Sequence, residues 1–226
     1  MAKKPIIELK DVWKIYQMGE VTVNALRGLT LQVYKGEFVA ISGPSGSGKS
    51  TAMNMVGCLD VPSKGIIKLD GQNISELGES KLAQIRGRKI GFVFQQFNLI
   101  QSLTALENVM LPMLFQNKSA HEREKKAMEL LQLVDLEDRA NHKPSELSGG
   151  QQQRVAIARS LANSPEMILA DEPTGNLDTK TGELIMAFLK KLNKDGTTVV
   201  MVTHDSDKAK AAQRIIHIRD GVCSKS

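Results

Sequence analysis

The sequence is poor in cysteine and in aromatic residues. Cys58 and Cys223 are the only cysteines among 226 residues, and neither belongs to a Cys-x-x-Cys pair. This scarcity disfavours a disulfide framework and structural zinc, and it suits a reducing compartment. Aromatic residues make up only 4% of the chain, which is a low share for a protein that binds nucleic acid by stacking on its bases.

Long apolar runs and a strong charge imbalance are absent as well. No stretch provides the roughly 20 predominantly apolar residues of a membrane span, and Met1–Pro5 is not followed by the apolar segment of a signal peptide. The formal net charge of +5 is mild, so it permits a polyanionic partner without arguing for one. A hydrophobic share of 41% is that of a globular chain, which excludes disorder and coiled coils.

The order of the apolar runs predicts an α/β fold. The second half alternates helical patterns with fully apolar runs, which is typical of a parallel sheet, whereas the first sixty residues are rich in strands and suggest an antiparallel edge. The expected strands are Ile6–Val12, Leu29–Val33, Phe38–Ile41, Ile66–Leu69, Ile90–Phe94, Met167–Ala170, Thr198–Thr203 and Arg214–Arg219. The expected helices are Ser50–Leu59, Thr104–Phe115, Ala120–Val134, Ser148–Ala162 and Lys180–Asn193.

These elements suggest one domain over residues 1–226. Residues about 96–160 read as almost entirely helical and are expected to form an inserted helical subdomain. The core, with its antiparallel β subdomain, would then comprise about 1–95 and 160–226.

The strongest motif lies between the expected strand Phe38–Ile41 and the helix after it. Gly43–Ser50 reads Gly-Pro-Ser-Gly-Ser-Gly-Lys-Ser and matches the phosphate-binding pattern G-x-x-x-x-G-K-[ST] at every fixed position. The glycines let backbone N–H groups turn inward, and the helix directs its positive end to the same place. Lys49 adds a charge for the β- and γ-phosphates, and the Ser50 hydroxyl is placed to bind Mg²⁺. A chance Gly/Ser-rich turn is the weaker interpretation.

Polar residues follow other expected strands at their carboxyl ends, where ligands of α/β sheets gather. Asp171 suits the surroundings of Mg²⁺, and Glu172 is free to polarise an attacking water, although a solvated acidic turn is the alternative. His204 follows Thr198–Thr203, and Gln95, with Gln96 as its rival, follows Ile90–Phe94.

Two further features bear on nucleotide binding. Tyr16 either stacks on a base or is an ordinary edge tyrosine. Ser148-Gly149-Gly150 at a helix start is either a second anion site or an ordinary N-cap. Because the chain has one phosphate-binding loop, a second anion site needs a second anion or a nucleotide held by a neighbouring chain.

Together these motifs resemble the ATPase subunits of ABC transporters over essentially the whole chain. Gly43–Ser50, Gln95, Leu147–Gln151, Ile168–Glu172, Asn176–Asp178 and His204 correspond in order to Walker A, Q-loop, signature, Walker B, D-loop and switch histidine. Met55–Asp60, Ile90–Ile100 and Asp171–Asp178 are similar to the LolD/MacB branch, which serves lipoprotein-release, macrolide-efflux and FtsX-like permeases. The resemblance implies a P-loop NTPase fold with a parallel core sheet, an antiparallel β subdomain and an inserted helical subdomain.

The resemblance also implies ATP and Mg²⁺ as ligands and a head-to-tail homodimer, with each ATP between Gly43–Thr51 of one chain and Ser148–Gly150 of the other. Glu172 would be the general base, and His204 would bind the γ-phosphate and the attacking water. The implied nucleotide-binding residues are Tyr16, Gly43, Pro44, Ser45, Gly46, Ser47, Gly48, Lys49, Ser50, Thr51, Gln95, Ser148, Gly149, Gly150 and Asp178. The implied metal-binding residues are Ser50, Gln95 and Asp171.

A permease partner is expected as well, on the inner face of the cell membrane. Ile90–Asn117 carries a single charge, Glu107, and four of the six phenylalanines. We expect the part from Phe97 to Phe115 to be a permease-docking surface rather than only core, and replacing Phe97 or Leu99 by Glu would test it. The alternative function, an ABC-type ATPase acting on nucleic acid or ribosomes, is disfavoured by the lack of a coiled-coil insertion or a second cassette.

Overall fold

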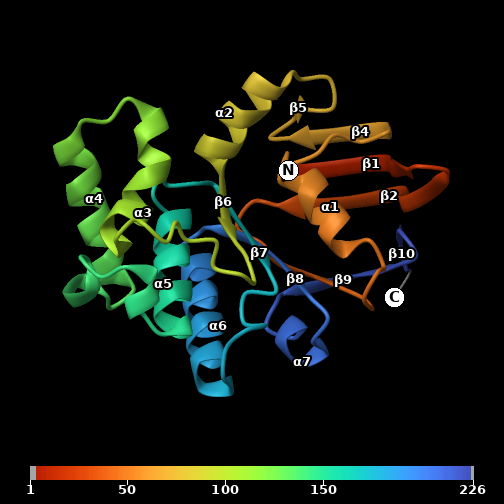
Figure 1. Cartoon of the computed structure of the whole chain (residues 1–226). Helices are drawn as coiled ribbons and strands as arrows, with labels where there is room; N and C mark the ends of the chain where they lie inside the picture. Colours follow the sequence, from red (N-terminus) through yellow and green to blue (C-terminus); the bar gives the residue numbers. More distant parts are fainter. Residues whose placement is uncertain (1–3, 225–226) are drawn as a thin grey trace. The chain divides into compact units, whose positions relative to one another are not determined.

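The computed structural model describes residues 4–224, which form two compact units. The first unit runs to Arg86 and resumes at Lys190, and the second comprises Gly87–Leu189. Two helices, α2 (Glu79–Lys89) and α6 (Thr179–Lys194), run from one unit into the other. Figure 1 shows the helices and strands of both units, coloured along the chain.

The first unit contains an antiparallel sheet in the order β2-β1-β4-β5. Its strands are β1 (Pro5–Met18), β2 (Val21–Tyr34), β4 (Lys64–Leu69) and β5 (Gln72–Asn73). β1 is twice as long as the expected Ile6–Val12, because pairing with β2 resumes beyond an irregularity after Leu9. There the Asp11 N–H bonds the Thr30 hydroxyl at 3.0 Å, so the backbone group stays satisfied and the strand continues.

The same unit contains parallel strands at its centre. β3 (Phe38–Ser42) pairs in parallel with β8 (Thr198–Thr203) on one side and β9 (Arg214–Arg219) on the other, and β10 (Val222–Cys223) pairs with β9. Every residue of β3 and β8 is buried, which is why their sequences are apolar without alternation.

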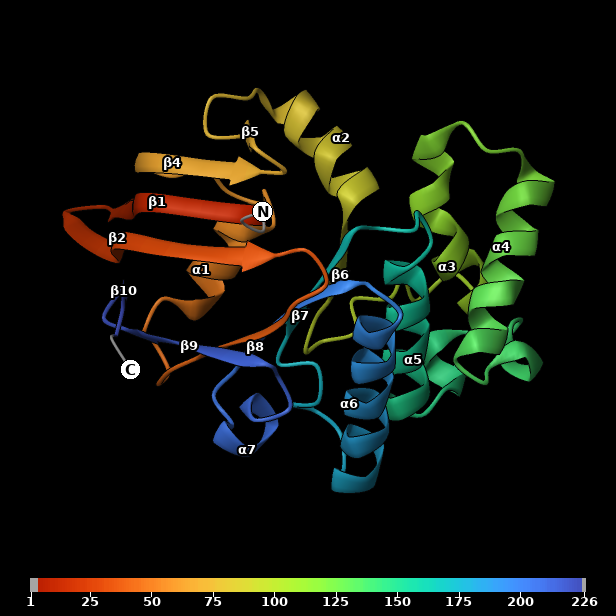
Figure 2. The ribbon, with the colours of Figure 1, turned by 180° about the vertical axis from the view of Figure 1, so that it is seen from behind.

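Two helices cover these strands. α1 (Lys49–Val56) lies between the antiparallel sheet and the parallel strands, and α7 (Ser206–Ala209) packs on β3 and β8 (Figures 1 and 2). The expected helix Ser50–Leu59 is therefore too long. The chain turns at Gly57, whose N–H bonds the Met53 carbonyl, and Cys58 takes a left-handed backbone conformation with φ 54°.

The second unit combines a parallel strand pair with a helical cluster. β6 (Ile90–Val93) pairs with β7 (Met167–Asp171). The helices are α3 (Ala105–Met110), η1 (Leu111–Gln116), α4 (Ala120–Leu133), η2 (Glu137–Arg139), η3 (Pro144–Glu146) and α5 (Gly149–Ser160). α3, α4 and α5 pack against one another around buried residues such as Val109, Met113 and Leu131, and α5 also packs on β6.

The expected helix Thr104–Phe115 is wrong as a single α-helix. It divides into α3 and the 3₁₀ helix η1, because Pro112 has no N–H to donate to the carbonyl one α-helical turn earlier. The fully buried Asn108 fixes the loop before α3, since its amide donates to the carbonyls of Ile100, Leu103 and Thr104.

Candidate nucleotide-binding site

The loop between β3 and α1 folds back over its own lysine. Lys49 is 8% exposed, and its Nζ donates to the Pro44 carbonyl oxygen at 2.7 Å. The Ser47 N–H approaches the same carbonyl at 3.3 Å, and the Gly221 N–H donates to the Ser47 carbonyl at 2.9 Å. The loop therefore holds a positive charge inside a turn of backbone.

The start of α1 is suited to an anion. Its N-cap, Gly48, has φ 98°, and a Cβ at this position would lie 2.5 Å from the Ala25 carbonyl oxygen, so only glycine fits. Because this N-cap is a glycine, it has no side chain to cap the helix, and the first N–H groups of α1 are suited to bind a ligand. Within residues 4–224 the buried Ser47 hydroxyl has no hydrogen-bond partner either, which fits a loop built to surround phosphate oxygens.

The parallel pairing of β3 and β8 places His204 beside this loop. Ser42 pairs with Thr203, so Gly43 and His204 leave the sheet from neighbouring strands at the same edge. Beyond His204 the chain turns into α7, whose N-cap Asp205 accepts from the N–H groups of Asp207 and Lys208. Hydrogen bonding to these backbone groups, that of Lys208 first, lowers the pKa of Asp205.

Tyr16 lies close to α1 and to the loop that follows this helix. Its hydroxyl donates to Asp60 Oδ2 at 3.0 Å, and the pKa of Tyr16 is raised by burial first and by Asp60 second, with a contact from the Thr51 hydroxyl acting in the opposite direction. The first unit thus brings Tyr16, the loop Gly43–Thr51 and His204 together around α1 and the edge of β3.

The second unit gathers a different set at the carboxyl ends of β6 and β7. Val93 pairs with Ala170, so Gln95 and Asp171 follow neighbouring strands. The Gln95 side chain donates to Asn176 Oδ1 at 3.2 Å, and Asn176 Nδ2 returns a bond to the Gln95 carbonyl at 3.0 Å. Gln95 is thereby tied to the turn that follows Glu172.

Glu172 has an unusual backbone conformation for a residue with a side chain. Its φ is 45°, in the left-handed region, and its carbonyl accepts the Gly175 N–H at 2.9 Å. The turn after β7 therefore begins at Glu172 itself, which directs the chain away from the strand immediately after Asp171.

The helix α5 connects these two loops, a role that single-sequence patterns do not indicate. Gln153, fully buried, donates to the Pro173 carbonyl at 2.6 Å and to the Phe94 carbonyl at 3.4 Å. The Arg159 guanidinium donates to the carbonyls of Phe97 and Asn98 at 3.0 and 2.6 Å. Neither side chain belongs to a motif, and their partners are distant in sequence.

Ser148 at the start of α5 is an N-cap with a full capping box. Its Oγ accepts from the Gln151 N–H at 3.3 Å, and Gln151 Oε1 accepts from the Ser148 N–H at 2.8 Å. The Ser148 hydroxyl keeps its proton for another acceptor. The helical glycine Gly150 lies close to the Thr181 side chain, and the Thr181 N–H bonds Asp178 Oδ1 at 3.0 Å. Hydrogen bonding to Thr181 lowers the pKa of Asp178.

Comparisons with known proteins show which family the chain belongs to. A family model described as ABC transporter matches residues 26–175, which is more than half of the chain. The chain belongs to the ABC transporter family of ATP-binding proteins. An ABC transporter ATP-binding protein of Thermotoga maritima is 58% identical over 96% of this chain and 93% of its own length. The macrolide export ATP-binding/permease protein MacB of Wolinella succinogenes is 50% identical over 97% of this chain but only 34% of its own length.

Solved structures give the same result for the fold. A dimeric, post-hydrolysis state of the ATP-binding cassette MJ0796 bound to ADP and Pi has a TM-score of 0.90, at 55% identity over 97% of both chains. This likeness confirms the predicted α/β fold. The chain is thus the ATP-binding, ATP-hydrolysing subunit of an ABC transporter of the MacB/LolD-like branch. Nothing in the comparisons supports the alternative of an ATPase acting on nucleic acid or ribosomes.

Replacing Lys49 by Ala is expected to weaken MgATP binding by about a hundredfold or more, since removing one member of a buried charge pair costs about 3–5 kcal/mol. Isothermal titration calorimetry measures the effect. Lys64→Ala, which removes an exposed lysine of β4, is the control and should bind like the unmodified chain. Unchanged MgATP binding by Lys49→Ala would refute the assignment of this loop to phosphate.

Proposed function

We propose that two copies of this chain bind head to tail and enclose two ATP molecules, each between Gly43–Thr51 of one copy and Ser148–Gly150 of the other. The observation that carries the proposal is that the chain has more sites suited to an anion than it has phosphate-binding loops. The chain has one phosphate-binding loop but a second helix start, at Ser148, whose hydroxyl proton and glycine N–H groups are suited to an anion. The relative MJ0796, whose solved structures are dimers, supports this arrangement.

The roles of the phosphate-contacting residues follow from their chemistry. Lys49 neutralises the β- and γ-phosphates, and the N–H groups at the start of α1 bind their oxygens. Ser50, Gln95 and Asp171 offer only oxygen ligands, the kind that Mg²⁺ prefers. When bound, Mg²⁺ neutralises charge on the phosphate oxygens.

Glu172 is the general base in this proposal. It accepts a proton from the attacking water, while His204, one residue past the strand beside the phosphate-binding loop, hydrogen-bonds the γ-phosphate and the same water. Asp178, held by Thr181 near Gly150, links the two sites of the dimer. Tyr16 stacks on the adenine ring.

The partner in the membrane is a permease, and the chain is then peripheral on the inner face of the cell membrane. The relative MacB, which carries ATP-binding and permease parts in one chain, supports such a partner. Among residues 4–224 no helix is both long and apolar enough to cross a bilayer.

The docking surface is narrower than the sequence suggests. Leu99 is 7% exposed and packs in the helical core, which leaves little of its side chain for a partner, and Phe97 is partly buried against the same core. In η1, by contrast, Leu114 is 49% and Phe115 is 79% exposed. We therefore assign the docking role to Leu114 and Phe115.

Glu172→Gln is expected to keep MgATP binding while reducing turnover by ~10²-fold or more, because Gln has nearly the same shape but accepts no proton from water. A single-turnover assay provides the measurement, with Glu183→Gln, an exposed carboxylate on α6, as the matched control. Near-normal hydrolysis by Glu172→Gln would assign the base elsewhere, with His204 as the first residue to test.

The head-to-tail arrangement is tested at Ser148. In a Glu172→Gln background, ATP should convert the chain from monomer to dimer on size-exclusion chromatography. Adding Ser148→Asp should abolish this ATP-dependent dimer, because Asp still caps α5 but repels the phosphate of the other copy.

The control for Ser148→Asp is Ser119→Asp, which makes the same change at the N-cap of α4 and should leave the dimer intact. An ATP-dependent dimer that survives Ser148→Asp would contradict the proposed position of the second chain.

Docking is tested by Phe115→Glu, with Leu184→Glu as control because Leu184, on α6, is 62% exposed. Phe115→Glu should abolish both co-purification with the permease partner and permease-stimulated turnover, while basal ATPase activity persists. If the folded Phe115→Glu variant still co-purifies at the normal level, this surface is not the docking site.

A further inference from the structure

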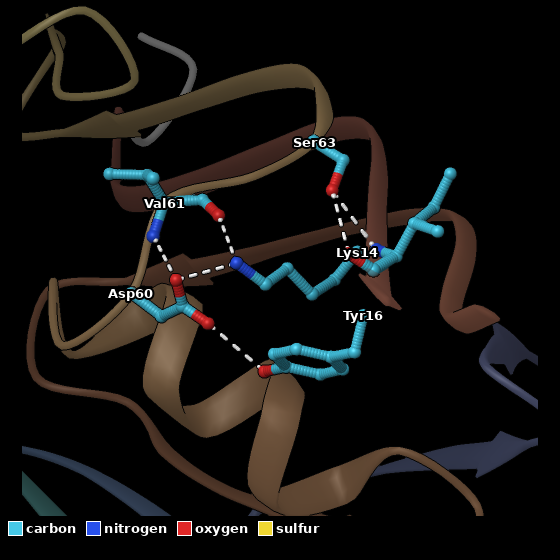
Figure 3. Close-up of polar contacts among 6 residues, drawn as sticks. Lys14, Tyr16, Asp60, Val61 and Ser63 are labelled. Atoms are coloured by element: carbon cyan, nitrogen blue, oxygen red, sulfur yellow. Dashed lines mark hydrogen bonds and ion pairs between the residues drawn. The ribbon is translucent and has the colours of Figure 1, made fainter. Parts of the chain in front are cut away.

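A polar cluster in the first unit contacts the Tyr16 side chain. Lys14 Nζ lies 2.6 Å from Asp60 Oδ1 and donates to the Val61 carbonyl at 3.0 Å, while the Tyr16 hydroxyl donates to the other Asp60 oxygen at 3.0 Å (Figure 3). The two Asp60 oxygens are thus used separately, one for each side chain. Because both bonds involve a carboxylate, they are stronger than bonds between neutral groups.

The cluster joins two elements that are distant in sequence. Lys14 and Tyr16 are two residues apart in β1 and so point to the same face of the sheet. Asp60 lies in the loop that follows α1, the helix whose first residues are Lys49 and Ser50. The Tyr16 hydroxyl is therefore attached to the phosphate-binding helix through the segment at that helix's end.

The carboxylate at the centre of the cluster is held in its charged form. Burial alone would raise the pKa of Asp60, but hydrogen bonds from Lys14, Tyr16 and the Val61 N–H outweigh it, so the pKa is lowered. Asp60 is 26% and Lys14 is 12% exposed at the side chain, so water competes little for the Lys14 ammonium. The acceptor for the Tyr16 hydroxyl is thus an anion whose position is fixed.

Lys14 also lies over one face of the Tyr16 ring. Its Nζ lies over the ring, 5.0 Å from the centroid, a distance at which a cation is attracted to the aromatic face. With the hydroxyl bonded to Asp60 and one face next to Lys14, the plane of the ring is defined.

We propose that Asp60 and Lys14 are positioning residues that hold the Tyr16 ring in the orientation needed to stack on the adenine of ATP. This inference rests on the proposed stacking role of Tyr16. A ring fixed before the nucleotide arrives loses less side-chain freedom on binding, so the cluster increases the affinity for the base without touching the phosphates.

The test compares a ligand that has a base with one that lacks it. We expect Asp60→Ala to raise the Kd for MgATP roughly fivefold, because a misaligned ring would lose part of the binding free energy that one base–aromatic stack contributes. The Kd for Mg-tripolyphosphate and kcat at saturating ATP should stay within about twofold. Glu79→Ala, which breaks an ion pair of the same 2.6 Å length with Arg86, is the matched control and should change neither Kd.

A double-mutant cycle with Tyr16→Ala separates positioning from other effects. Once the ring is gone, Asp60→Ala should cost no further ATP affinity. Tyr16→Phe keeps the ring and removes only the hydroxyl, so it should reproduce the ATP-specific loss, and it carries the test if Asp60→Ala fails to fold.

Four results would overturn the proposal. The first is an equal loss of tripolyphosphate affinity in Asp60→Ala, which would mean that Asp60 merely supports α1. The second is that the losses of ATP affinity caused by Asp60→Ala and Tyr16→Ala are additive in the cycle. The third is that Asp60→Ala leaves the ATP affinity unchanged while Tyr16→Ala lowers it, a result that would still be consistent with the stacking role of Tyr16. If Tyr16→Ala itself has normal ATP affinity, the proposed stacking role fails, and the positioning role fails with it.

Discussion

Parallel strand pairing fixes where the polar groups of both units lie. In the first unit, the register of β3 with β8 makes the phosphate-binding loop and His204 leave from neighbouring strand ends. In the second, the register of β6 with β7 does the same for Gln95 and Asp171. A slip of one residue would displace a strand end by about 3.3 Å, more than a hydrogen bond tolerates, and would turn every side chain of the strand to the opposite face. Because β3 and β8 are buried throughout, neither face can accept such a slip without disturbing the packing.

The loops at these strand ends depend on polar side chains of α5 as well as on apolar contacts. In the second unit, Gln153 holds the segments after β6 and β7 through their carbonyls, and Arg159 holds the residues that follow Gln95. Leaving the Pro173 carbonyl, whose bond to Gln153 is buried, without a donor would cost about 1–3 kcal/mol. The two loops are therefore attached to the same helix, α5, whose first turn carries the Ser148 cap.

The sequence predicts the parts of this fold whose residues repeat a simple pattern. The uninterrupted apolar runs Phe38–Ile41 and Thr198–Thr203 identify β3 and β8, and the phosphate-binding loop is recognisable from its glycines and Lys49. The helix α2 escaped prediction because only Leu82 and Ile85 of its eleven residues are buried, which leaves too weak an apolar stripe. The bond between Tyr16 and Asp60 joins residues 44 positions apart, and no local pattern encodes such a contact.

The segment from Phe97 to Phe115 shows the same limit for surfaces. Its low charge is visible in the sequence, but which side chains face solvent depends on tertiary packing. Met113 and Phe115 are two residues apart in one short helix, and they are fully buried and 79% exposed, respectively. Composition indicates that a segment is apolar, whereas the packing of α3, α4 and α5 decides which of its residues are left for a partner.

The backbone of Glu172 has a consequence for engineering this protein. A side chain in the left-handed region costs about 1–3 kcal/mol, which glycine would avoid. A search for stabilised variants that scores only folding would thus favour glycine at 172 and discard the carboxylate beside Asp171. Selection for thermal stability would favour glycine at position 172, whereas selection for turnover would favour glutamate. Residue 172 should therefore be kept constant when variants of this ATPase are selected for stability.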